Sequence, residues 1–449
     1  MIRVLSVLLS PFARGVSVFT SRNTAPFYSR YTLRFHLPAE LLLGAVGGIT
    51  QLGDLVARKT LGAPDWMIAL QSSIPTVALL FAMVWRDLLE GASRRKVLLA
   101  TGLFGKGLLL FMAAAASPGL FLLVFIAFSF ADSAFIPVRN SIFRANYPDA
   151  LRGRYFGLVV SLTSLAVIGA NLVAAWLLDR WEGSYRLLFP AAGVLGLIAH
   201  ATYARLRVRG DGQIEHRAPT DPLLRRAAGS IRRAFRSTVR ILKADRAFFA
   251  YESAFFLYGL AFLMNLPLVV LLITDRLHLS YGQASWARFV VPPVMMVLFS
   301  PIAGRLLDRS HSSVMMGVAC FLLAAHSVLL AAANGIGLLM LSYFIFGVAM
   351  TGVNLAWNLG PVQFARTEHE SLDYMGVHVT LTGLRGAIAP FLALGAKRFL
   401  GLTAGFVVST ALFLTAALLM ARLSRRISSA APPPATIGRP DPRAEERRS

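Results

Sequence analysis

The sequence contains one cysteine and little charge. Cys320 stands alone, so a disulfide within the chain and a metal cluster held by several cysteines are both excluded. Charged residues make up 15% of the chain, whereas soluble proteins carry about 25%. No Walker phosphate-binding sequence is present, so we expect no ATP hydrolysis by this chain. We expect a protein that is not an enzyme and that holds no cofactor and no metal.

The chain is rich instead in apolar residues, which make up 56% of its 449 residues. Its formal net charge is +23, and a basic balance can indicate nucleic-acid binding. However, the Lys and Arg residues lie in the gaps between apolar runs, the aromatic residues lie within those runs, and no zinc-ligand spacing occurs. This pattern is typical of the cytoplasmic loops of a membrane protein, so nucleic acid is not an expected partner.

Apolar runs of about 18 to 26 residues recur, each long enough to cross a hydrocarbon core of about 30 Å as a helix. Their unbroken apolar character excludes the alternating pattern of a barrel. The sequence thus predicts an all-α polytopic membrane protein of about twelve transmembrane helices. The predicted spans are 38–57, 66–84, 97–116, 120–142, 155–178, 186–204, 248–273, 283–307, 314–333, 336–359, 374–396 and 402–420.

The Lys and Arg residues concentrate in the two tails and in the loops that follow even-numbered spans. The positive-inside rule therefore predicts a protein of the cell inner membrane with both termini in the cytoplasm. We divide the chain into a cytoplasmic tail (1–37), an N-terminal six-helix bundle (38–205), a basic cytoplasmic linker (206–246), a C-terminal six-helix bundle (247–421) and a disordered cytoplasmic tail (422–449).

The linker contains an amphipathic pattern. A helix can start after Asp221-Pro222, and Arg residues flank its apolar positions, which are Leu223, Ile231, Phe235, Val239 and Leu242. A basic amphipathic helix is expected to lie on the surface of the inner leaflet. The pattern suits either an inert linker helix or a regulatory docking segment, and both interpretations stay open.

The two predicted bundles repeat one another. Tyr155-Phe156-Gly157 before Leu162-Thr163 matches Tyr374-Met375-Gly376 before Leu381-Thr382, and Asp54 before Trp66 matches Asp275 before Trp286 at nearly the same offset. The loop at 304–309 also has a weaker counterpart at 86–91. Two parallel six-helix halves imply a pseudo-twofold axis along the membrane normal, with a central cavity between them.

The repeated loop carries a family resemblance. Gly304-x-Leu306-x-Asp308-Arg309 resembles the loop motif of the major facilitator superfamily, and the stretch 148–157 resembles the loop between helices 4 and 5 of that family. The resemblance covers nearly the whole chain at the level of topology. It implies a twelve-helix secondary transporter that works by alternating access. The run G-x-x-x-G-P, a mark of the family's proton-antiporting exporters, is missing from helix 5, which disfavours drug export.

The resemblance also implies that the loop motif is conformational. Asp308 would pair with a basic residue on a neighbouring helix end and hold one state closed, although a solvated turn is the alternative. The first-half copy is degraded, because Glu90 replaces the Asp and only its Arg94-Arg95 end is intact. The predicted gating residues are Glu90, Arg94, Arg95, Gly304, Asp308 and Arg309.

Ionisable residues within the spans are functional candidates, because such a residue in lipid needs a cavity or a partner. Asp132 and Arg139 are seven residues apart on helix 4 and so point the same way. Helices 1, 4, 7 and 10 line the cavity in the resembled family, so Asp132 is the first candidate for proton coupling. The alternative for Asp132 and Arg139 is a structural pair with a neighbouring helix. Asp54 and Glu252 are the further coupling candidates. The alternatives are that Asp54 is an interface residue paired with Arg58, and that Glu252 extends toward water or meets Arg246.

Other polar side chains in the spans are candidates to bind the solute, although interhelical hydrogen bonds explain them equally well. They are Gln51, Lys106, Arg139, Tyr258, Asn265, Asn354, Asn358 and Arg385. The deep cations among them suit an anionic or zwitterionic solute.

The sequence thus predicts a monomeric secondary active transporter of a small organic solute, coupled to H⁺ and surrounded by membrane lipid. The alternatives are a lipid or lysolipid flippase on the same fold, or a drug or metabolite exporter. The substrate and the direction of transport do not follow from the sequence, and coupling to H⁺ and the monomeric state are expectations that the sequence does not fix.

Overall fold

The computed structural model describes residues 27–89, 92–208, 223–308 and 310–430. Within these residues the ordered elements are helices and no strand occurs. Eleven of the described helices are long and apolar enough to cross a membrane, and Asp65–Phe81 is a shorter apolar helix. The predicted all-α polytopic fold is confirmed, and the chain is a multi-pass membrane protein.

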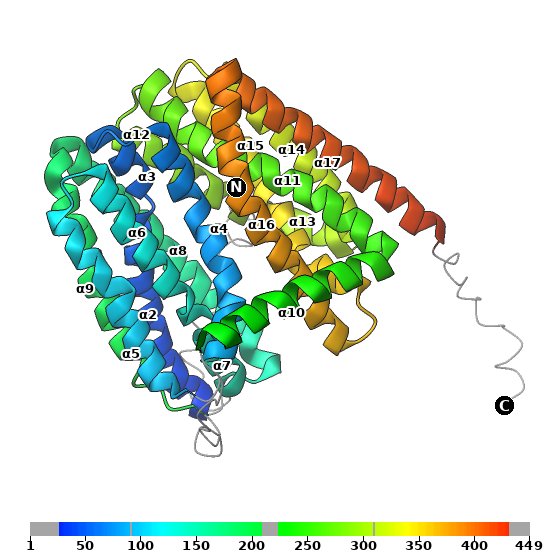
Figure 1. Cartoon of the computed structure of the whole chain (residues 1–449), viewed down its shortest axis with the longest axis horizontal. Coiled ribbons are helices and arrows are strands. Elements are labelled where there is room, and N and C mark those ends of the chain that lie inside the picture. The colour runs from blue at the N-terminus through cyan, green and yellow to red at the C-terminus, as the bar shows by residue number, and fades with distance from the viewer. Residues whose placement is uncertain (1–26, 90–91, 209–222, 309, 431–449) are drawn as a thin grey trace, which may run out of the picture.

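The elements fall into two groups joined by α10 (Leu223–Ala244), and Figure 1 shows the two groups side by side. The N-terminal half contains α2 (Phe27–Thr50), α3 (Gly53–Leu55), η1 (Val56–Thr60), α4 (Asp65–Leu88), α5 (Arg94–Phe104), η2 (Lys106–Ala114), α6 (Pro118–Ser133), α7 (Phe135–Asn146), α8 (Asp149–Arg180), η3 (Glu182–Ser184) and α9 (Tyr185–Tyr203). The C-terminal half contains α11 (Arg246–Leu271), η5 (Leu272–Arg276), α12 (Tyr281–Ser285), η6 (Trp286–Val290), α13 (Val291–Asp308), α14 (Ser312–Ala332), α15 (Ile336–Leu359), η7 (Pro361–Phe364), α16 (Glu368–Leu400) and α17 (Leu402–Ala430).

Several helices extend beyond the predicted spans. The first helix begins at Phe27 rather than at residue 38, and Pro38 lies inside it. The last helix continues to Ala430, so residues 422–430 are helical rather than part of a disordered tail. Hydropathy detects only the part of a helix that lipid surrounds, so polar turns at either end are missed. The rest of the two predicted tails, 1–26 and 431–449, lies outside the described residues.

Glycines allow close packing within the N-terminal half. On α2, Gly44 and Gly48 lie one turn apart and face α8, and a Cβ atom on either would collide with the carbonyl oxygen of Thr163 or of Val167. The side chain of Asn171 donates a hydrogen bond of 2.9 Å to the Gly48 carbonyl oxygen. Small residues spaced in this way let two membrane helices approach closely.

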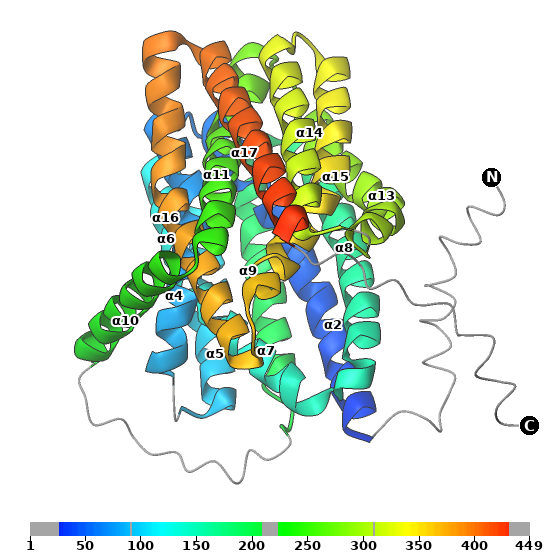
Figure 2. The same cartoon turned by 90° about the vertical axis from the view of Figure 1, so that its right-hand side faces the viewer.

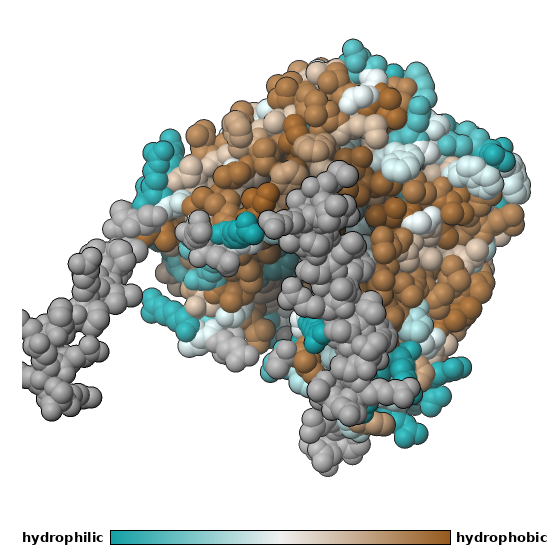
Figure 3. All heavy atoms as spheres, turned by 180° about the vertical axis from the view of Figure 1, so that it is seen from behind, coloured by the Kyte–Doolittle hydropathy of each residue, from teal (hydrophilic) through white to brown (hydrophobic). Residues whose placement is uncertain are grey.

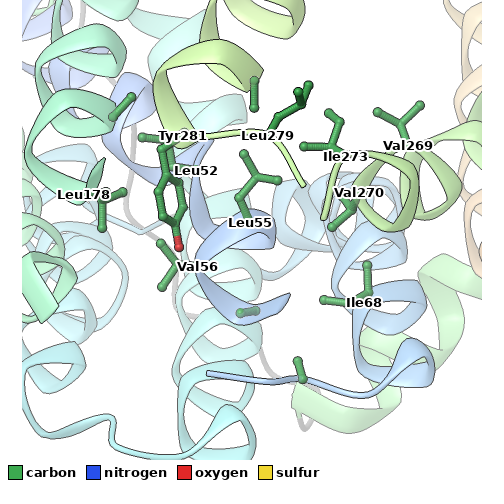
Figure 4. Packing of buried hydrophobic residues seen from close by; sticks show 14 of the residues in the cluster. Leu52, Leu55, Val56, Ile68, Leu178, Val269, Val270, Ile273, Leu279 and Tyr281 are labelled. Atoms are coloured by element: carbon green, nitrogen blue, oxygen red, sulfur yellow. The ribbon is translucent and has the colours of Figure 1, made fainter. Parts of the chain in front are cut away.

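The two halves share a core at one end of the molecule. Leu52 and Leu55 of the first half lie in one buried cluster with Val270 and Leu279 of the second half, and Figure 4 shows these side chains together. We call this end, with the connections 61–64 and 277–280, the ion-paired face, and the opposite end the α10 face. Apolar side chains also cover broad areas of the described surface, with hydrophilic ones toward its margins (Figure 3).

Candidate functional site

Ion pairs join the two halves at the ion-paired face. Arg58 donates to both carboxylate oxygens of Asp275, with Nε–Oδ1 and Nη2–Oδ2 distances of 2.9 and 2.5 Å. Arg58 lies in η1 and Asp275 in η5, two π-helical turns at the equivalent ends of the first helix of each half. A π turn inserts an extra residue into a helix, so it redirects the side chains that follow. The repeat therefore places opposite charges against each other.

A second connection links α4 to α16. Lys397 Nζ lies 2.6 Å from Asp65 Oδ2, and Asp65 also lies 3.2 Å from Arg58 Nη1. Asp65 occupies the first turn of α4 and Lys397 the last turn of α16. An acid at a helix start and a base at a helix end are each favoured by the helix dipole, so both helices support this pair.

The most buried of these connections joins Asp54 to Arg288. The guanidinium Nη2 and Nη1 atoms lie 2.6 and 3.2 Å from the two carboxylate oxygens, in a two-pronged arrangement. The side chains are 19% and 10% exposed, whereas those of Arg58 and Asp275 are 21% and 34% exposed. A charge pair is stronger where water is excluded. Among these contacts between the halves, the loss of one partner should therefore cost most at Asp54–Arg288.

The ends of α8 and α12 also meet at this face. The Asp179 carboxylate accepts hydrogen bonds from the backbone N–H groups of Tyr281 (2.6 Å) and Gly282 (2.8 Å), at the start of α12. The hydroxyl groups of Thr60 and Tyr281 are 2.5 Å apart. Free N–H groups at a helix start attract an anion, so Asp179 completes the closure of this face.

Another polar cluster lies within the N-terminal half and contains a residue that the sequence analysis missed. The Glu40 carboxylate accepts hydrogen bonds from Arg139 (3.2 Å) and from the Tyr203 hydroxyl (2.5 Å), and His36 lies 4.0 Å from it. The predicted start of the first helix at residue 38 placed Glu40 at a helix end. The i, i+4 spacing of His36 and Glu40 was the available signal.

Asp132 pairs with a different cation. Lys106 Nζ lies 2.9 Å from Asp132 Oδ2, and both residues belong to the N-terminal half. Asp132 is on α6 and Arg139 is on α7, two segments that meet at Ala134, and their ion-pair partners are on different helices. Asp132 thus forms an ion pair with a neighbouring helix of its own half, and its side chain is 27% exposed.

The C-terminal half has its own buried cluster. Glu252 and His378 are hydrogen-bonded at 2.8 Å, and this pairing replaces the contact with Arg246 that we considered for Glu252. Arg385 donates to the Phe255 carbonyl oxygen at 2.7 Å. Its side chain lies directly against Gly259, where a Cβ atom would collide with the guanidinium group. Within the described part of the chain, no carboxylate lies within ion-pair distance of Arg385.

The uncharged candidates divide into two groups. Tyr258 and Asn265 are buried, and the Asn265 amide donates to the Ser327 hydroxyl at 3.1 Å. Asn265 also lines a cavity of about 160 Å³ that Arg288 borders. Gln51, Asn354 and Asn358 are exposed, and Asn358 donates to the Asn354 carbonyl oxygen at 2.7 Å. Helix-to-helix or local hydrogen bonds thus account for Asn265 and Asn358.

The predicted gating loops lie at the α10 face. Gly304 is in the last turns of α13, and Arg94 and Arg95 begin α5. Asp308 is the last residue of α13, and its side chain is not among those described. Glu90 and Arg309 lie outside the described residues. The role of these loops stays a prediction.

Comparison with known proteins gives a family. The family model described as Major Facilitator Superfamily matches residues 12–390 of the chain. None of the curated proteins matches the sequence.

Solved transporters have a similar fold. The nucleoside transporter NupG gives a TM-score of 0.65 at 15% identity, over 90% of this chain and 99% of that one. The peptide transporter POT with sulfate gives 0.70 at 14% identity, over 92% and 99%. A bacterial homologue of the human lysosomal transporter Spinster, inward-facing and occupied, gives 0.67 at 13% identity, over 92% and 100%. Such low identities show the fold alone.

Proposed function

The chain belongs to the Major Facilitator Superfamily, and we propose that it is a secondary transporter that moves a small organic solute by alternating access. In this proposal the two halves rock about the central axis and open at one face at a time. The observation that carries it is the set of contacts between the halves at the ion-paired face, above all Asp54–Arg288. Charge pairs at this position must break whenever that face opens.

We place the α10 face in the cytoplasm of a cell with an inner membrane. The described loops and helix ends at that face are rich in Arg and Lys, which the positive-inside rule assigns to the cytoplasm. The ion-paired face then faces outward, and the described conformation is the one closed to the outside.

We propose Asp54 as the residue that couples transport to protons. Its partner Arg288 belongs to the other half of the protein. By contrast, Asp132 pairs with Lys106 of its own half, and Glu252 pairs with His378 of its own half. Protonation of Asp54 removes its charge, so the attraction that holds the two halves together at this point is lost. Protonation of Asp132 or Glu252 has no such direct effect on the contact between halves.

We propose an anionic or zwitterionic solute on the basis of Arg385. This Arg is 4% exposed and near the middle of α16, and it has hydrogen bonds but no carboxylate at ion-pair distance within the described residues. A guanidinium group in that position can bind a carboxylate through two hydrogen bonds once the helices around it move.

Side-specific cysteine labelling tests the gate assignment without knowledge of the solute. Cys320 is buried and is replaced first, as Cys320→Ala. Ile68→Cys then reports on the closed face, because Ile68 is fully buried in the cluster shared by the two halves. We expect an impermeant maleimide outside to label this cysteine faster when Asp54→Asn is added. Equal labelling in a folded Asp54→Asn protein would contradict the gate assignment.

A further inference from the structure

The linker helix α10 exposes an apolar stripe. Ile231, Phe235 and Val239 are four residues apart and therefore share one face of the helix. Their exposed fractions are 54%, 60% and 38%, so this face is not covered by the described residues of the bundle. Exposure of three large apolar side chains in a row to water is unfavourable, so we expect a partner to cover them.

A second stripe, of positive charge, runs directly beside the first. Arg232, Arg236 and Arg240 each follow one residue after a member of the apolar stripe, and Lys243 continues the row. All four side chains are exposed. The helix contains no acidic residue. The partner that covers this surface is therefore apolar on one side and negatively charged on the other.

The face of α10 that lies opposite the cationic stripe, and next to the apolar one, is fixed to both halves of the protein. Thr238 and Ile241 are buried, and the helix packs against α4 of the first half and against α16 of the second. Figure 1 shows α10 crossing both helices. Asp245 follows directly and caps α11 by accepting a 2.9 Å hydrogen bond from the Phe248 N–H, while the Tyr374 hydroxyl donates to it at 3.0 Å.

The position of α10 identifies the partner. A one-residue link, Asp245, separates its end from Arg246, where the membrane span α11 begins. The C-terminal end of α10 therefore lies at the membrane boundary, and Figure 2 shows the helix beside the lower part of α4. At this boundary lipid presents acyl chains next to phosphate groups, which match the apolar and the cationic stripe respectively.

We propose that α10 is a binding site for the headgroups of anionic phospholipids, and that lipid bound there stabilises the conformation closed at the ion-paired face. The second part rests on the proposed alternating access. Because α10 contacts α4 and α16 together, rocking of the halves changes the surface on which it rests. A ligand that binds α10 in its present position has a higher affinity for the present conformation than for the other one. It therefore shifts the equilibrium toward the present conformation by that difference in affinity.

A spin label at Phe235→Cys, in the Cys320→Ala background, measures the first part. We compare bilayers of phosphatidylcholine with bilayers that also contain phosphatidylglycerol, and record the accessibility of the label to oxygen and to a water-soluble nickel chelate. Phosphatidylglycerol should raise the contact with oxygen and lower the contact with nickel. Combined Arg232→Gln, Arg236→Gln and Arg240→Gln should remove this response.

The control removes the same number of exposed charges elsewhere, with Lys96→Gln, Arg422→Gln and Arg425→Gln, and should keep the response. A label that stays in water in both bilayers overturns the lipid site. A label that is equally deep in both shows apolar docking without headgroup binding, and this also overturns the site. Inorganic phosphate that reproduces the response in phosphatidylcholine assigns the cations to free phosphate and overturns the lipid assignment.

The proposed stabilisation of the closed conformation is tested by the rate at which Ile68→Cys is labelled from outside. Phosphatidylglycerol should slow this labelling several-fold in the parent protein and leave it unchanged in the triple Arg variant. If phosphatidylglycerol has no effect while Asp54→Asn still raises the labelling, lipid regulation is wrong and the gate stands. If Asp54→Asn also has no effect, the proposed gating itself has failed.

Discussion

Removal of the Asp54 charge should shift the protein toward the conformation open at the ion-paired face. In the closed form, Arg288 binds Asp54 through two hydrogen bonds, and neither side chain is more than one-fifth exposed. Asp54→Asn is nearly isosteric, so it removes the charge and leaves the packing intact. The guanidinium group of Arg288 then remains partly buried without its carboxylate, a state that opening of the face relieves by admitting water.

The size of this shift follows from the burial of the pair. Loss of one partner of a fully buried pair costs about 3–5 kcal/mol. Part of that cost is screened here because Asp54 is 19% exposed, so we take about 2 kcal/mol, or roughly thirty-fold in the ratio of closed to open forms. Outside labelling of Ile68→Cys should increase by a similar factor, provided that opening limits the rate.

The matched control is Asp132→Asn. It removes the charge from an ion pair of similar length, but Lys106 lies in the same half as Asp132. It should therefore leave the labelling of Ile68→Cys near the parent level. The reasoning is refuted if Asp132→Asn increases the labelling as much as Asp54→Asn does, or if neither changes it while both proteins remain folded.

Three further changes have defined outcomes. Arg58→Gln breaks a more exposed pair, worth about 0–1 kcal/mol, so it should raise the labelling of Ile68→Cys less than Asp54→Asn, and an equal or larger rise would count against the ranking by burial. Gly259→Ala places a methyl group against the Arg385 guanidinium and should cost about 1–3 kcal/mol, seen as a lower melting temperature in detergent; an unchanged value would contradict the packing. Burial lowers the pKa of His311, which caps α14. The unfolded chain therefore binds a proton at His311 more readily than the folded protein does. As the pH falls from the pKa of His311 in the unfolded chain toward its lower pKa in the folded protein, the folded protein loses stability. His311→Asn keeps a capping side chain and should flatten this acid loss of melting temperature, and an unchanged slope would exclude His311 as its source.

The fold could be predicted from the sequence because membrane helices are encoded by long apolar runs. The order of the helices was predicted from this pattern, and the linker helix observed at 223–244 was predicted from its amphipathic pattern. The start of the first helix was not predicted correctly. Its first turns are too polar for a membrane span, since they contain Tyr28, Arg30 and Arg34, and Pro38 resembles a helix start. A helix that continues beyond lipid is held by tertiary packing, which hydropathy does not measure.

The candidate site was predicted only in part, because partners in it are distant in sequence. Asp54 was recognised as a charge near a helix end, yet its partner Arg288 is 234 residues away in the sequence. Glu40 was missed because its importance depends on where the first helix begins. The charges could be found one at a time, whereas their pairing depends on how the two halves pack.

A pair of distance measurements by electron paramagnetic resonance tests alternating access most directly. One label pair, Leu61→Cys and Leu277→Cys, spans the ion-paired face, and the other, Leu151→Cys and Arg305→Cys, spans the α10 face. When Asp54→Asn is added, the first distance should increase and the second should decrease, because rigid halves that rock apart at one end approach at the other. An increase at the ion-paired face with no change at the α10 face would indicate local loosening of that face and would contradict rocking of the two halves.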